Sequence, residues 1–286
     1  MKSLKVQELL FKGYEILKNE EIESYMIDCQ LILGKVLSLD KMSILLNRDK
    51  EVDEQKAKEF FSLLEKRKNR MPLKYITKSC EFMGIDFFIK EGVLVPRPDT
   101  EILVEEVLKE IRNYNFKRIC DVCCGSGAIG VSIAEIIDTA NVQCYDISEI
   151  AEEVTETNIE LQNLKDRVEF IRSDLLTFAI EKQLKFDVIV SNPPYIRTDV
   201  IPTLMKDVRD YEPYIALWGG EDGLDFYRKI TNQSLEVLKN RGILAYEIGY
   251  DQGLAVQQIL LENGYTNVRV VKDLAGMDRV VMGMKI

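Results

Sequence analysis

The sequence contains no histidine among its 286 residues. This absence excludes Ser-His-Asp and Cys-His catalysis, zinc sites that use histidine, and histidine as a general base. Proton chemistry must therefore use Asp, Glu, Lys, Tyr or Cys. Long apolar runs are also missing. None approaches the ~18 residues that indicate a membrane span, so we predict no membrane-spanning helix.

The sequence has no excess of positive charge and no signal-like start. Its net charge is -10, which disfavours nonspecific binding to nucleic acid because that affinity comes from clustered Lys and Arg. A basic protein partner is compatible with this charge, and a local basic patch stays open. The first twenty residues lack an uninterrupted apolar core and a small-residue cleavage site, so we expect a cytoplasmic location.

Six cysteines are present, and three of them, Cys120, Cys123 and Cys124, lie close together. In the absence of a secretory signal we expect reduced thiols. A metal or redox site is one interpretation, but a four-cysteine zinc site usually has two separated pairs. We favour small buried hydrophobic residues on a core strand and its turn, and we expect no metal.

The pattern of apolar residues changes twice along the chain. Residues 1–72 have helical spacing of apolar residues without strand-like alternation, which predicts a helical bundle domain. In 73–96, Gly84 between two short apolar runs predicts a β-hairpin connector. From 97 to 286 strands and helices alternate, which predicts an α/β domain with an open, mostly parallel sheet.

We expect seven strands in this sheet, and the last two are too close for a parallel crossover, which predicts an antiparallel C-terminal hairpin. The expected strands are 118–123, 141–146, 168–172, 186–191, 242–248, 267–271 and 279–285.

A glycine-rich turn follows the first of these strands. Gly125, Gly127 and Gly130 match G-x-G-x-x-G, a pattern that lets a ligand approach the backbone and the N-terminal amides of a helix. Asp146 ends the second strand 19 residues after Gly127, where a carboxylate accepts hydrogen bonds from ribose hydroxyls. The pair predicts a nucleotide-like ligand, although such a turn can also serve helix packing alone.

Two classes of cofactor use this arrangement. Dinucleotides place a pyrophosphate at the turn, whereas S-adenosylmethionine has a ribose, an adenine and an amino-acid tail without phosphate. A carboxylate at Asp121, beside the turn, would repel a pyrophosphate and attract the ammonium of a methionyl tail. Asp121 therefore favours S-adenosylmethionine a little, and a dinucleotide stays open.

The fourth expected strand ends in Asn192-Pro193-Pro194-Tyr195, at the sheet edge where open α/β folds bind ligands. Two prolines stiffen this corner and remove two donors, so it offers carbonyls and the Asn192 side chain as acceptors. A planar NH2 group can pair with the Asn192 oxygen and the Pro193 carbonyl, while Tyr195 packs on it. Accepting both hydrogens would return electron density to an amide nitrogen and aim it at an electrophile without a strong base.

With these residues in place, the sequence resembles the release factor glutamine methyltransferases, the HemK/PrmC family of S-adenosylmethionine-dependent enzymes, over nearly its whole length. Besides Asn192–Tyr195, the resemblance rests on Val95–Glu101, Tyr211–Leu217 with Gly219–Gly223, Glu247–Gly249 and Asp278–Val281. It implies a Rossmann-like class I methyltransferase domain and an N-terminal domain that helps to recognise the protein substrate. The implied reaction methylates the side-chain amide nitrogen of the glutamine in the Gly-Gly-Gln motif of peptide chain release factors.

The resemblance also implies roles for individual residues. The cofactor-binding residues would be Asp121, Cys123, Cys124, Gly125, Ser126, Gly127, Asp146, Asp174, Leu175 and Asn192. The residues that hold the glutamine would be Asn192, Pro193, Pro194 and Tyr195, with Asn192, Pro193 and Tyr195 catalytic. Cys123 replaces the first glycine of the family turn and is strained if its φ is positive, and Leu175 stands where the family can have an aromatic residue.

Three other functions stay open. A nucleic-acid amino-group methyltransferase is the nearest, because an exocyclic base NH2 is also planar. An NAD-dependent oxidoreductase is permitted by the glycine turn, and a noncatalytic module would bind the cofactor without turnover. We favour release factors as partners, a monomer, and no nucleic-acid substrate.

Overall fold

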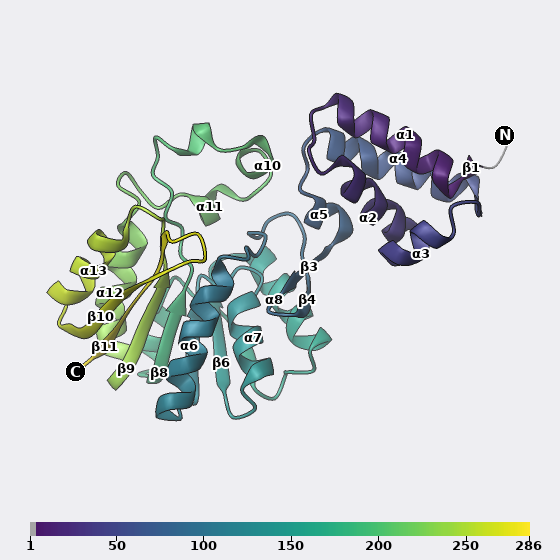
Figure 1. The fold of residues 1–286 in the computed structure, drawn as a ribbon. Coiled ribbons are helices and arrows are strands. Elements are labelled where there is room, and N and C mark those ends of the chain that lie inside the picture. Colours follow the sequence, from purple (N-terminus) through teal and green to yellow (C-terminus); the bar gives the residue numbers. More distant parts are fainter. Residues whose placement is uncertain (1–3) are drawn as a thin grey trace. The chain divides into compact units, whose positions relative to one another are not determined.

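The computed structural model describes residues 4–286 and divides the chain into two compact units (Figure 1). Unit 1 comprises Met1–Ser79 and Met205–Tyr211. Unit 2 comprises Cys80–Leu204 and Glu212–Ile286. No helix in the described part of the chain is long and apolar enough to cross a membrane.

Unit 1 is built from helices whose apolar residues recur at helical spacing and form one core. Its helices are α1 (Val6–Asn19), α2 (Tyr25–Leu37), α3 (Lys41–Leu46), α4 (Glu54–Lys68), α5 (Leu73–Thr77) and α10 (Lys206–Arg209). The α4 helix begins where the Asp53 carboxylate accepts a hydrogen bond from the Lys56 backbone N–H at 2.9 Å, which satisfies a free donor of the first turn. Leu9, Leu33 and Phe60 are fully buried in the core between the helices.

Two short strands in unit 1 were not predicted. β1 (Leu4–Lys5) and β2 (Glu51–Val52) pair antiparallel. A two-residue strand has no alternation to detect, so only the contact between distant segments defines it.

Unit 2 contains the predicted seven-stranded sheet. Its strands, in chain order, are β5 (Arg118–Val122), β6 (Asn141–Asp146), β7 (Val168–Arg172), β8 (Phe186–Ser191), β9 (Leu238–Glu247), β10 (Tyr265–Lys272) and β11 (Asp278–Lys285). They lie in the order β10-β11-β9-β8-β5-β6-β7, and β11 runs antiparallel to both of its neighbours. The fold class and the antiparallel C-terminal hairpin are therefore confirmed. The hairpin at Gly84 is formed by β3 (Ser79–Phe82) and β4 (Ile85–Phe88).

The β9 strand is longer than its sequence suggested. β9 begins at Leu238 rather than 242, and Leu238 pairs with Phe186 before the register shifts. The polar stretch after Leu238 includes Arg241 at a positive φ of 64°, so a local irregularity interrupts the apolar pattern of the strand.

Helices cover both faces of the sheet. The helices of unit 2 are α6 (Thr100–Tyr114), α7 (Ala128–Ile136), α8 (Glu149–Leu161), α9 (Thr177–Glu181), the 3-10 helix η1 (Ile201–Thr203), α11 (Tyr214–Leu217), α12 (Asp225–Val237) and α13 (Gly253–Glu262). In β6, Cys144 faces α7, whereas its neighbour Tyr145 belongs to the core shared with α9, α12 and α13. Successive strand residues point to opposite faces, so two helical layers enclose the sheet.

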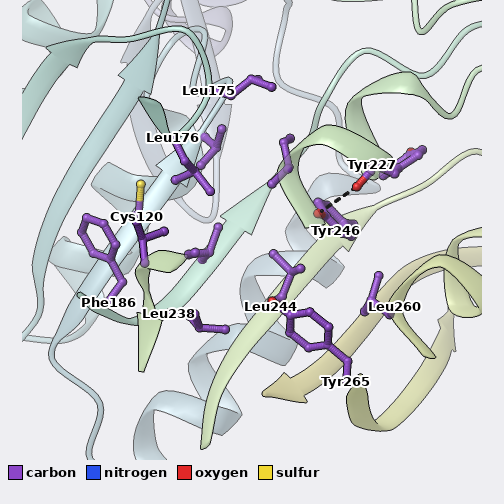
Figure 2. Close-up of a cluster of buried hydrophobic side chains, with 14 of the residues drawn as sticks. Cys120, Leu175, Leu176, Phe186, Tyr227, Leu238, Leu244, Tyr246, Leu260 and Tyr265 are labelled. Carbon is purple, nitrogen blue, oxygen red and sulfur yellow. Dashed lines mark hydrogen bonds between the residues drawn. The ribbon is translucent and has the colours of Figure 1, made fainter. Parts of the chain in front are cut away.

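Buried tyrosines tie α12 to the sheet (Figure 2). The Tyr227 hydroxyl donates to the backbone carbonyl of Glu247 at 3.0 Å. The Tyr246 hydroxyl lies 2.9 Å from the Thr231 hydroxyl, and the Tyr265 hydroxyl lies 2.6 Å from Ser234. Each phenol thus buries its ring and still has a hydrogen-bond partner, which fixes the helix against strand ends that carry candidate site residues.

Candidate functional site

The glycine turn lies directly after β5. Cys123, Gly125 and Gly127 have φ values of 60°, 57° and 74°. A non-glycine residue in this region carries strain of about 1–2 kcal/mol, so Cys123 is held there by its surroundings. One such restraint is the neighbouring Cys124 backbone N–H, which donates to the Tyr145 carbonyl at 3.1 Å.

The absence of a side chain serves a different purpose at each glycine of the turn. A Cβ on Gly125 would meet nothing within 4 Å, so this side of the turn is open to a ligand. A Cβ on Gly127 would lie 2.8 Å from Thr155 Cγ2, and one on Gly130 would lie 2.6 Å from Cys144 Sγ. Gly127 therefore lets α8 pack closely against the turn, and Gly130 lets β6 pack closely against α7. Gly125 is the position that leaves space for a ligand.

Asp146, at the end of β6, restrains the turn. Its Oδ2 accepts a hydrogen bond from Gly125 N at 2.9 Å, and its Oδ1 accepts one from Ser148 N at 3.0 Å. Burial raises the pKa of Asp146, and these backbone hydrogen bonds oppose the rise. Each carboxylate oxygen has a second acceptor position, so Asp146 can also bind a hydroxyl group.

A pocket of about 270 Å³ brings most of the expected cofactor residues together. The expected residues that line it are Cys123, Cys124, Gly125, Ser126, Asp146, Asp174, Leu175, Asn192 and Pro194. Its charged lining residues, within the described chain, are Asp146, Asp174 and Lys229. Two carboxylates and one ammonium suit a cationic ligand without phosphate better than a pyrophosphate.

Asp121 is not among the lining residues of this pocket in the part of the chain that is described. It is fully buried, and its Oδ2 accepts a hydrogen bond from Gly130 N in the first turn of α7 at 2.9 Å. Burial raises the pKa of Asp121 to about 7, and its Oδ1 has no hydrogen-bond partner. This geometry gives Asp121 a contact that holds α7 against β5, and no pattern in the sequence indicated that contact.

The three clustered cysteines are free thiols. Burial raises the pKa of Cys120, Cys123 and Cys124. The thiolate is the form that binds metals and attacks disulfides, so this environment disfavours both reactions. Residues 4–286 contain no group of Cys, Asp and Glu side chains arranged to hold a metal ion.

The Asn192–Tyr195 corner follows β8 at the same edge of the sheet. Asn192 and Pro194 line the pocket, whereas Pro193 and Tyr195 are outside the set of lining residues found in 4–286. The Asn192 side-chain nitrogen donates to the Thr100 hydroxyl at 3.4 Å. Burial raises the pKa of the Tyr195 hydroxyl, so it stays protonated.

A second loop supports this corner through backbone contacts. Ile196 N donates to the Leu217 carbonyl at 2.9 Å, and Gly219 N donates to the Ile196 carbonyl at 2.9 Å. A Cβ on Gly219 would lie 2.6 Å from Tyr195 Cα. Only glycine lets the two backbones approach so closely, which gives a physical reason for the glycine in this segment.

Gln252, which the sequence analysis missed, joins both loops. Its Nε2 donates to the carbonyls of Tyr195 and Gly223, each at 3.1 Å. Its Oε1 accepts from Gly249 N at 2.9 Å and from the Tyr227 hydroxyl at 3.3 Å. The only sequence signal was its place shortly after Glu247–Gly249.

Glu247, noted in the sequence only as part of the family resemblance, lies behind Asn192. It ends β9 and is 2% exposed, and its Oε2 has no hydrogen-bond partner. Burial raises the pKa of Glu247 to about 7, opposed by hydrogen bonds from Thr100 and Asn192 and by the charge of Arg279. Few buried polar atoms in folded proteins lack a hydrogen-bond partner, so a partly satisfied carboxylate beside a candidate binding residue points to a specific role.

The chain is similar to known methyltransferases in sequence. The family models for the PrmC N-terminal domain and the methyltransferase small domain match residues 8–77 and 97–206. The release factor glutamine methyltransferase of Clostridium botulinum is 55% identical over 98% of this chain and 99% of its own length. That of Clostridium acetobutylicum is 51% identical over 99% of both chains.

A solved structure supports the fold independently. The crystal structure of a methyltransferase from Pyrococcus furiosus has a TM-score of 0.52 and 20% identity, and the match covers 74% of this chain and 93% of that one. At this identity the match shows the fold alone, whereas the two clostridial relatives match almost the whole chain at over half of its positions. The chain therefore belongs to the release factor glutamine methyltransferases.

Proposed function

We propose that this chain transfers a methyl group from S-adenosylmethionine to the side-chain amide nitrogen of the glutamine in the Gly-Gly-Gln motif of peptide chain release factors. The observation that carries this proposal is the pocket that Asn192 and Pro194 share with the glycine turn and Asp146. An acceptor site for a planar amide and a donor site for a nucleoside thereby meet at one sheet edge.

The residues present fit S-adenosylmethionine. When bound, this cofactor supplies an electrophilic methyl group on a positively charged sulfur. Asp146 would accept the ribose hydroxyls, Gly125 leaves space beside the turn, and Asp174 with Leu175 would flank the adenine. Asp121 could act on the methionyl ammonium only at longer range or through water, because it is fully buried.

The chain's own contribution to the reaction is to hold the glutamine amide. The Asn192 oxygen and the Pro193 carbonyl would each accept one N–H, so that the nitrogen lone pair is less delocalised and points at the methyl carbon. Fixing two reactants in this way can contribute up to about 7–11 kcal/mol. Proton loss from the methylated nitrogen to water completes the reaction, so no histidine is required.

The helical unit would recognise the release factor. A separate domain ahead of the catalytic one suits a macromolecular substrate, and the net charge of -10 suits a protein substrate better than nucleic acid. On this account the enzyme is a cytoplasmic monomer that does not methylate nucleic acid directly.

The direct test is to incubate the protein with methyl-labelled S-adenosylmethionine and, in parallel, release factor, DNA and ribosomal RNA. We expect label in the release factor alone. Asn192→Ala should lower the rate by a few powers of ten and change cofactor affinity little, because the lost contact holds the acceptor. Asn232→Ala, at an exposed position on α12, is the matched control and should be active.

Other outcomes would redirect the proposal. Label in nucleic acid alone would indicate an amino-group methyltransferase of the rival class. Cofactor binding without label in any acceptor would favour a binding module, and thermal stabilisation by NADH but not by S-adenosylmethionine would favour an oxidoreductase.

A further inference from the structure

The side-chain amide of Asn192 has two possible orientations. A side-chain amide can be turned over with little change of shape, and its hydrogen-bond partners decide which atom faces which side. The proposed reaction needs the oxygen toward the pocket, because a nitrogen there would present N–H groups to the N–H groups of the glutamine. Some neighbour must therefore select one orientation.

Glu247 is placed to do so. The parallel strands β8 and β9 pair Ser191 with Tyr246, so Asn192, the residue directly after β8, lies beside Glu247, the last residue of β9. The Asn192 amide and the Thr100 hydroxyl both approach the Glu247 carboxylate. Thr100 is 4% exposed and is the first residue of α6. The polar cluster of Asn192, Thr100 and Glu247 is therefore shielded from solvent on the side away from the pocket.

We propose that Glu247, as a carboxylate, is a positioning residue that holds the Asn192 side chain with its nitrogen inward and its oxygen toward the pocket. An ionised carboxylate only accepts hydrogen bonds, so the amide nitrogen must face it. The Thr100 hydroxyl can donate to the carboxylate and accept from Asn192 Nδ2, which lies at 3.4 Å. This inference rests on the proposed function, in which Asn192 binds the glutamine.

Charged and titratable groups from several elements surround Glu247. Arg279 on β11 favours the carboxylate, while Asp99, before α6, disfavours it. Tyr195, after β8, and Tyr227, on α12, are close enough for the Glu247 charge to raise their pKa values. Burial is the largest effect and raises the pKa of Glu247 to about 7, so the orienting form is lost as the pH falls below neutral.

Glu247→Gln tests the inference, because glutamine keeps the shape but can present N–H groups to Asn192. At pH 8 we expect kcat for release factor methylation to fall tenfold or more, with KM for S-adenosylmethionine within twofold of wild type. Toward pH 6 the ratio of wild-type to variant kcat should close, because protonated Glu247 loses the same selectivity. A purely structural role would give a ratio that does not change with pH.

Glu110→Gln is the matched control. Glu110 is also buried and pairs with Arg269 at 2.7 Å, but it lies ten residues along α6 from Thr100, about 15 Å at 1.5 Å per residue. Its kcat should stay within twofold of wild type.

Each result is decisive. A Glu247→Gln enzyme within twofold of wild type at pH 8 would overturn the inference, whereas a wild-type enzyme that does not methylate release factor would overturn the proposed function instead. If the variant does not fold, the wild-type profile decides: kcat must decline on the acid side of neutrality, and a profile that is flat to pH 5.5 would contradict the role of Glu247.

Discussion

Asp146 satisfies two requirements with one carboxylate. Its two oxygens accept backbone N–H groups from Gly125 and Ser148, and the same side chain lines the pocket. The turn and the proposed ribose site are therefore fixed by one residue. Loss of this side chain would remove the proposed acceptor of the ribose hydroxyls. It would also remove the hydrogen-bond partner of Gly125 N.

For this reason Asp146→Ala should weaken cofactor binding first. We expect the Kd for S-adenosylmethionine to rise about 10- to 100-fold, because hydrogen bonds to a charged group contribute about 1.5–3 kcal/mol. Isothermal titration calorimetry measures this directly. Asp138→Ala, at an exposed position, is the control, and unchanged affinity in Asp146→Ala would refute the ribose assignment.

The sequence could indicate Asp146 and Asn192 as site residues because each ends or follows a predicted strand. In an open α/β sheet, these strand ends meet at one edge. Gln252 could not be found in this way. Gln252 contacts a carbonyl 57 positions away in the sequence, and such contacts depend on tertiary packing that no local pattern encodes.

At the scale of elements, the site depends on irregular segments between β8 and α13 that are held by backbone contacts. Gln252 uses both amide hydrogens and its oxygen to hold the carbonyls of Tyr195 and Gly223 and the N–H of Gly249. Gln252 thereby links the Asn192–Tyr195 corner to the start of α13, in addition to the backbone contacts of the corner with Leu217 and Gly219.

Gln252→Leu should show this dependence. The buried carbonyls would lose their donor, and we expect the protein to lose about 2–4 kcal/mol of unfolding free energy. The methylation rate of the folded protein should also fall at least tenfold. Gln258→Leu, on the exposed side of α13, should change neither quantity. Chemical denaturation and a methylation assay test both parts, and a stable, fully active Gln252→Leu variant would contradict the role of this bridge.

At the scale of the whole molecule, the α/β order of unit 2 was predictable because its strands are short, apolar and separated by helical patterns. Unit 1 also includes Met205–Tyr211, although the neighbours of this segment in the sequence belong to unit 2. There the buried Arg67 guanidinium pairs with Asp28 and with Asp207, each at 2.7 Å. One turn of helix in a polar loop has no periodic signal, so contacts between distant segments, such as these ion pairs and the hydrogen bond from the Tyr211 hydroxyl to the Asn69 carbonyl, show where it belongs.

The central claim is that the chain methylates one atom of one residue type in a protein substrate. The most direct measurement is tandem mass spectrometry of purified release factor after incubation with the enzyme and S-adenosylmethionine. We predict a single added methyl group on the side-chain nitrogen of the Gly-Gly-Gln glutamine, absent when Asn192→Ala replaces the wild type. A methyl group on any other atom, or an unmodified release factor in the presence of cofactor-bound enzyme, would contradict the account.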